Sequence, residues 1–150
     1  MNDFGKTYRD LLDGALLKLW AERSQLVSAA RESLSHELAR RSLTHEADLI
    51  PEMWSLSEEQ RYIAKLLFAV VKDEVSGNDA IALIERRAKY WEQSISRDAH
   101  IDVAYHTLRH FDDDSDIRSR DSNYDQAVRL ALQKRADALL GAAQEHDSQT

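Results

Sequence analysis

The chain has 150 residues, of which 43% are hydrophobic and 31% are charged, and this composition excludes a disordered or a membrane-embedded chain. Its 27 acidic and 20 basic side chains give a formal net charge of -7, so the average field repels the phosphates of nucleic acids and of anionic lipids. The sequence contains no Cys, which excludes disulfides, thiolate nucleophiles and zinc–thiolate sites. We therefore expect neither nucleic acid nor a membrane as a partner.

Turn-forming residues are scarce throughout the chain. Four Gly and one Pro disfavour a β-sandwich or barrel and favour long helices. The first residues lack the pattern of a secretion signal, and the longest strictly apolar run, residues 66–71, is far too short to cross a bilayer. We predict an all-α, single-domain bundle of five or six helices over residues 1–150, in the cytoplasm, with residues 144–150 as a frayed polar tail.

The first predicted element is one long helix over residues 6–42, where apolar residues recur in helical steps of three and four. A helix of that length would extend about 55 Å, so we expect it either to bend near residues 24–25 or to project its second half. That half carries a narrow apolar stripe between charged residues, typical of a helix-pairing seam. The stripe predicts a homodimer, with one more core-facing helix as the equal alternative, and it consists of Val27, Ala30, Leu34 and Leu38.

The next predicted helix follows a loop with a helical turn at residues 44–54. Ser57 stands three residues before Gln60, which is the spacing of a capping box at a helix start. The helix is expected to run to about Val75. Its middle is apolar around most of its circumference, which predicts the buried central helix of the bundle.

Three more helices are expected in the second half of the chain. Gly77 predicts a helix end and a short antiparallel hairpin into the next helix. Another helix is expected from Ser96 to about Phe111, and the last one from near Asp121 or Ser122 to Gly141.

A metal site is the first candidate function that the spacing suggests. Asp102, His106 and His110 stand four residues apart, but the outer two are separated by about 12 Å along a helix axis, whereas ligands lie about 2 Å from a shared ion. At most two neighbours could bind one ion. We expect these three residues on the surface, and we expect no metal or other cofactor.

The acidic run at residues 112–116 is the second candidate. As a calcium loop it fails at both diagnostic places, where Ile117 and Asn123 replace the required Gly and Glu. The simplest reading is a solvated acidic turn near a helix start. The functional hypothesis is a binding surface for a basic protein partner, made by Asp112, Asp113, Asp114 and Asp116.

Catalytic patterns are missing from the sequence. There is no Gly-x-Ser-x-Gly motif, and the four Gly stand too far apart to form a phosphate-binding loop. Two Arg–His pairs, Arg31 with His36 and Arg40 with His45, have the spacing found in dimeric helical nucleases, but chance supplies as many. We therefore expect no enzymatic activity.

The leading hypothesis is a non-enzymatic protein-binding module, such as a small acidic inhibitor, an immunity protein, an adaptor or a regulatory protein. The alternative is a helical sensor domain that binds a small molecule between its Trp-bearing helices. The aromatic residues available for that cavity are Trp20, Trp54 and Trp91, with Tyr62 and Tyr90.

Overall fold

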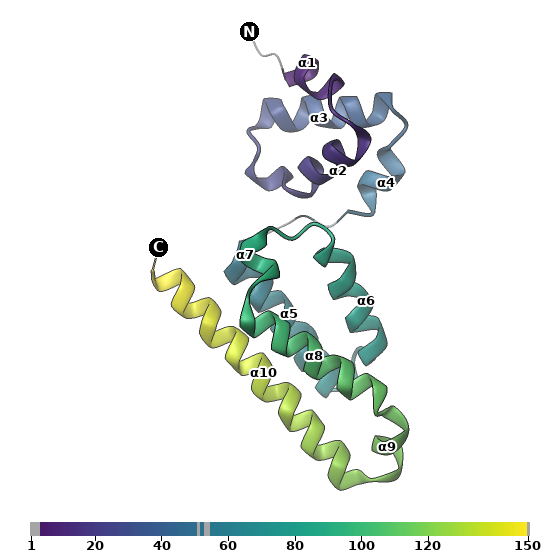
Figure 1. Ribbon diagram of the computed structural model, residues 1–150, viewed down its shortest axis with the longest axis vertical. Coiled ribbons are helices and arrows are strands. Elements are labelled where there is room, and N and C mark those ends of the chain that lie inside the picture. The colour runs from purple at the N-terminus through teal and green to yellow at the C-terminus, as the bar shows by residue number, and fades with distance from the viewer. Residues whose placement is uncertain (1–3, 51, 53–54, 150) are drawn as a thin grey trace. The chain divides into compact units, whose positions relative to one another are not determined.

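The computed structural model describes residues 4–50, 52 and 55–149. In these residues the regular structure consists of ten α-helices and one 3₁₀-helix, without strands (Figure 1). The all-α class is therefore confirmed, whereas the expected number of helices is wrong. The contacts divide the chain into an N-terminal unit, residues 1–54, and a C-terminal unit, residues 55–150. The single domain stays a prediction.

The N-terminal unit is built from short helices instead of the predicted long one. The chain leaves the α-helical conformation at residues 10–12 and again at residues 22–27, the second break lying where a bend was expected. These breaks fold the chain so that its later half packs against its earlier half, which a straight helix could not do. The helices are α1 (Phe4–Arg9), α2 (Asp13–Ala21), the 3₁₀-helix η1 (Arg23–Gln25), α3 (Ser28–Arg40) and α4 (Thr44–Asp48).

The core of the N-terminal unit is small and is closed by α3. Leu34 and Leu38 of α3 are buried together with Tyr8 of α1 and Leu16 of α2. Helix α3 is therefore the core-facing helix that the sequence left open as an alternative. Burial of these apolar side chains against α1 and α2 is the dominant favourable contribution to the stability of this unit.

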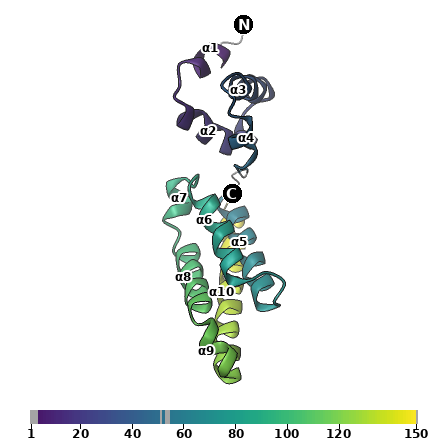
Figure 2. The ribbon, with the colours of Figure 1, turned by 90° about the vertical axis from the view of Figure 1, so that its right-hand side faces the viewer.

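The C-terminal unit contains the longer helices, and α5 lies at its centre, as predicted. Helix α5 packs most extensively against α10 and also contacts α6, α7 and α8. Figures 1 and 2 show α5, α8 and α10 running side by side. The helices are α5 (Leu56–Val71), α6 (Gly77–Ala88), α7 (Gln93–Ser96), α8 (Ala99–Asp113), α9 (Ser115–Arg120) and α10 (Ser122–Ser148).

The start of α5 differs from the predicted one by two residues. Its cap is Ser55, whose hydroxyl accepts a hydrogen bond from the backbone N–H of Glu58 at 3.3 Å. Ser57 and Gln60, the predicted capping box, are instead buried inside the helix. Both Ser residues have the capping spacing in the sequence, and burial of the second one against neighbouring helices decides between them.

Gly77 begins α6 and does not end α5, which contradicts the predicted role. The side chain of Ser76 caps α6 by accepting from the N–H of Asp79 at 3.1 Å. A Cβ atom on residue 77 would lie 3.1 Å from Oδ1 of Asp112, so a larger residue at this helix start would require the Asp112 side chain of α8 to shift. Helix α5 ends earlier, at Val71, and Asp73 follows with a left-handed φ of 61°.

The last helix begins where it was expected and continues further than expected. Asp121 caps α10 by accepting from the N–H of Tyr124 at 3.0 Å. The helix passes through Gly141, its predicted end, to Ser148, because Ala143 is buried and Asp147 pairs with Arg61 of α5. Residues 144–148 are therefore helical. Helix α8 begins after Asp98, not after Ser96, which ends α7.

Candidate functional site

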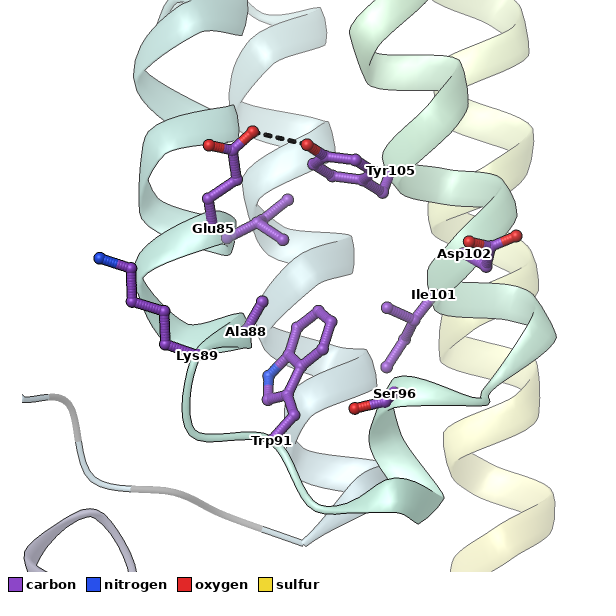
Figure 3. A pocket seen from close by; sticks show the side chains of 9 residues that line it. Glu85, Ala88, Lys89, Trp91, Ser96, Ile101, Asp102 and Tyr105 are labelled. Atoms are coloured by element: carbon purple, nitrogen blue, oxygen red, sulfur yellow. Dashed lines mark hydrogen bonds between the residues drawn. The ribbon is translucent and has the colours of Figure 1, made fainter. Parts of the chain in front are cut away.

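A cavity of about 420 Å³ lies between α6, α7 and α8 in the C-terminal unit (Figure 3). Its walls are mostly apolar and come from Ile84 and Ala88 of α6, Ile101 of α8, and the rings of Trp91 and Tyr105. Residues 89–98 connect α6 to α8 and contain only the single turn of α7. The two helices are therefore not joined by a tight turn at this end. A cavity of this volume with apolar walls is typical of a small-molecule site.

The wall made by Trp91 is fixed by a buried ion pair. Glu59 of α5 is 0% exposed and Arg87 of α6 is 5% exposed. Nε of Arg87 lies 2.9 and 3.0 Å from the two carboxylate oxygens of Glu59, and the indole N–H of Trp91 donates to Oε2 of Glu59 at 3.2 Å. Arg87 fixes the Glu59 carboxylate, and this carboxylate accepts the hydrogen bond of the indole. The Trp91 ring is therefore oriented before any ligand binds.

The rim of the cavity carries the polar groups. Tyr105 donates its hydroxyl hydrogen to Oε1 of Glu85 at 2.5 Å, drawn as the dashed line in Figure 3. Nη1 of Arg109 lies 3.3 Å from the Tyr105 oxygen, and this hydrogen bond raises the pKa of Arg109. Asp102 stands on the same helix as Tyr105, and the exposed Lys89 and Ser96 complete the rim. The polar groups therefore surround an apolar interior, as they do in sites where they set the orientation of a ligand.

Among the cavity candidates that fall in the described residues, Trp91 is the one that lines the cavity. Tyr62 instead lies under the guanidinium of Arg87, whose Cζ is 4.9 Å from its ring centre. Trp20 belongs to the N-terminal unit and donates its N–H to the carbonyl of Ala47 at 3.1 Å. Tyr90 does not line the cavity, and Trp54 lies outside the described residues.

Glu85 and Tyr105 were not singled out as site residues by sequence reasoning. Glu85 follows Ile84 and precedes Ala88 by three, while Tyr105 follows Ile101 by four, so each shares a helix side with an apolar wall residue. This spacing identifies the boundary of an apolar face. It does not reveal that the faces of α6 and α8 meet around a cavity.

The four Asp residues proposed to bind a basic partner do not form one open surface. Asp114 accepts the hydroxyl hydrogen of Tyr124, which raises the pKa of that phenol. Asp112 lies against the start of α6 at Gly77. Asp113 and Asp116 are exposed. A basic protein partner therefore stays a prediction that rests on two of the four carboxylates.

The proposed self-association stripe lies largely inside the N-terminal unit. Ala30, Leu34 and Leu38 are buried in its core, and Val27 alone is exposed, at 64%. The homodimer was predicted on the ground that this stripe would face water. In the structure most of the stripe does not face water, so this argument no longer supports the homodimer. The homodimer stays a prediction.

The residues considered for a metal site are on the surface, as expected. Asp102, His106 and His110 are exposed, and Nε2 of His106 lies 3.3 Å from Oδ1 of Asp102. Among the described residues, no three His, Asp or Glu side chains gather as metal ligands would.

Comparison with known proteins identifies no relative of this chain. No family model matches the chain, and no curated protein or solved structure matches it significantly. In the part of the chain that the structure describes, every helix lacks either the length or the apolar character that a membrane span requires.

Proposed function

We propose that the protein binds a small organic molecule in the cavity between α6, α7 and α8 and does so without transforming it. The observation that carries the proposal is the pre-oriented indole of Trp91 beside an open apolar volume of about 420 Å³. Apolar walls supply the affinity for such a ligand, because burying its surface removes that surface from water. Polar groups at the rim supply its orientation.

A binding role without catalysis fits the chemistry of the lining. The rim groups Glu85 and Tyr105 are already hydrogen-bonded to each other, and Arg109, which is not a lining residue, lies 3.9 Å from Oε1 of Glu85 and 3.3 Å from the Tyr105 oxygen. The small-molecule sensor, the alternative from the sequence, is thus the function best supported by the geometry. The protein-binding module and the cytoplasmic location stay predictions.

The proposal is tested by a thermal-shift screen of a chemically diverse compound library against three forms of the full chain. The forms are wild type, Ala88→Leu, which places a larger side chain into the cavity, and Ala82→Leu, a matched control at an exposed position of the same helix. A compound at 100 times its Kd adds about 2.7 kcal/mol of stability. We expect compounds that raise the Tm of wild type and of Ala82→Leu by several degrees but leave Ala88→Leu unchanged.

Two results contradict the proposal. One is that all stabilising compounds act equally on Ala88→Leu, which places their site elsewhere. The other is that no compound stabilises the wild-type chain although Ala88→Leu and Ala82→Leu are both folded by circular dichroism.

A further inference from the structure

We propose that the ligand of this cavity is a compact organic cation: a flat apolar body that carries one ammonium group. This inference rests on the proposed function and adds the chemical class of the ligand. Three features carry it, namely the way the chain treats its other aromatic rings, the position of two carboxylates at the rim, and the fixed orientation of Trp91.

The chain covers several of its own aromatic rings with guanidinium groups. Cation–π contacts of this kind are favourable, and Trp offers the most favourable ring. Within the described residues no Arg or Lys is placed over the ring of Trp91, although this ring borders the open cavity. The rings that do have a guanidinium over them are Trp20 with Arg23, Tyr62 with Arg87, Tyr105 with Arg109, and Phe111 with Arg118. An external cation would give the Trp91 ring the kind of partner that these four rings have.

The rim places two carboxylates on different helices around the same opening. Glu85 comes from α6 and Asp102 from α8, with side chains 52% and 66% exposed. Lys89 is the one cation among the described lining residues, so the lining as a whole carries a net negative charge. In Figure 3 the Lys89 chain extends away from the indole of Trp91, while Asp102 lies at the opposite side of the opening. An ammonium group on a bound ligand is attracted by this rim, and a carboxylate is repelled.

The two carboxylates are not saturated by their present partners. Glu85 accepts one hydrogen bond from Tyr105 at 2.5 Å and lies 3.9 Å from Nη1 of Arg109, and a carboxylate has room for several hydrogen bonds. Asp102 lies 3.3 Å from His106, which is itself exposed and is a cation only when protonated. Asp102 is therefore the carboxylate best able to take a charge-assisted hydrogen bond from a ligand ammonium.

The inference is tested with three naphthalene probes that differ in the group one carbon from the ring. They are 1-naphthylmethylamine, a cation, 1-naphthylmethanol, which is neutral, and 1-naphthoate, an anion. Binding is followed through the ¹⁵N-labelled indole N–H signal of Trp91, assigned by its loss in Trp91→Phe. Because that N–H is hydrogen-bonded to Glu59 at the cavity wall, its signal reports on this site and not on the other Trp residues.

We expect the amine to bind about fivefold or more tightly than the alcohol, and the naphthoate to bind most weakly. Asp102→Asn should weaken binding of the amine at least threefold, or roughly 0.6 kcal/mol, and leave the alcohol unchanged. Asp116→Asn, which neutralises an exposed carboxylate of α9, is the matched control and should change neither.

Equal binding of the three probes, or tighter binding of the alcohol or the naphthoate, overturns the cationic class and leaves the proposed function intact. An effect of Asp102→Asn no larger than that of Asp116→Asn also overturns it. If no probe moves the Trp91 signal, this ligand class is wrong, and the compound screen with Ala88→Leu decides separately whether the cavity binds any molecule.

Discussion

Each of the two units buries one glutamate, and they hold it in different ways. Glu37 of the N-terminal unit pairs with Arg40 of its own helix and with Arg41, the residue that caps its end, with Nε of each guanidinium 2.9 Å from the carboxylate. Glu59 of the C-terminal unit pairs with Arg87, which is 28 residues away, and with the indole of Trp91. A local pair stabilises a helix that already exists, whereas a distant pair fixes how two helices and an aromatic ring meet. The second arrangement holds Trp91 in the wall of the cavity.

The largest effect is expected from breaking the distant pair. Arg87→Met leaves the carboxylate of Glu59, which is 0% exposed, without its cation, and loss of one partner of a buried pair costs about 3–5 kcal/mol. The double variant Glu59→Met/Arg87→Met should recover part of that loss, because no buried charge remains. Urea denaturation measures both. Equal losses in the single and double variants would show that packing and not the buried charge is responsible.

A smaller effect is expected when the indole N–H is removed and the ring is kept. Trp91→Phe deletes the donor to Glu59, and a hydrogen bond to a charged group contributes about 1.5–3 kcal/mol. Since Arg87 still holds the carboxylate, the loss should fall at the lower end of that range. The same urea measurement checks it. A loss as large as that of Arg87→Met would mean that the indole and not the guanidinium is the main partner of Glu59.

The local pair of the N-terminal unit should respond less to substitution. Arg41 donates to Glu37, to Asp13 and to the carbonyls of Tyr8 and Arg9, so Arg41→Met removes these hydrogen bonds and leaves the apolar packing of α3 on α1 in place. Because Arg40 still faces Glu37, we expect a smaller fall in stability than for Arg87→Met. Hydrogen exchange of the α1 amides, which reports on this unit alone, should rise while exchange in α5 stays unchanged. Faster exchange in α5 would contradict the division into two separate effects.

The pH dependence of the N-terminal unit follows from the same local pair. The hydrogen bonds from Arg40 and then Arg41 lower the pKa of Glu37 from 4.5 to about 2. A carboxyl whose pKa is lowered by folding contributes stability above its unfolded pKa and loses it as the pH falls. Wild type should therefore lose more stability than Glu37→Gln between about pH 4.5 and pH 2. Thermal melts over this range test it, and parallel curves for the two proteins would refute the assignment.

The local features of the fold could be predicted from the sequence, and the cavity could not. The apolar circumference around residues 63–71 and the cap at Asp121 are set by neighbours in the chain, so α5 and the start of α10 were predicted. A bend near residues 24–25 was also one of the two predicted alternatives, again from the local sequence. Ser55 and Ser57 were not distinguishable, since burial of Ser57 depends on other helices.

The candidate site depends on contacts between distant residues, which periodicity does not encode. From the sequence alone, Trp91 and Tyr105 look like core residues of two separate helices. Glu59 looks like an exposed residue in the first turn of a helix. That Arg87 and Trp91 meet this glutamate follows only from the packing of α6 on α5. Of the aromatic candidates, Trp91 lines the cavity, whereas Trp20 and Tyr62 pack elsewhere.

The most direct test of the central claim, that the C-terminal unit binds a small molecule beside Trp91, is a set of intermolecular nuclear Overhauser effects. They are measured between the protein and a compound that stabilises wild type. The account predicts contacts from the compound to the indole protons of Trp91 and to the methyl groups of Ile84 and Ile101, all of which line the cavity. Contacts confined to protons outside α6, α7 and α8, with none to Trp91, would contradict it.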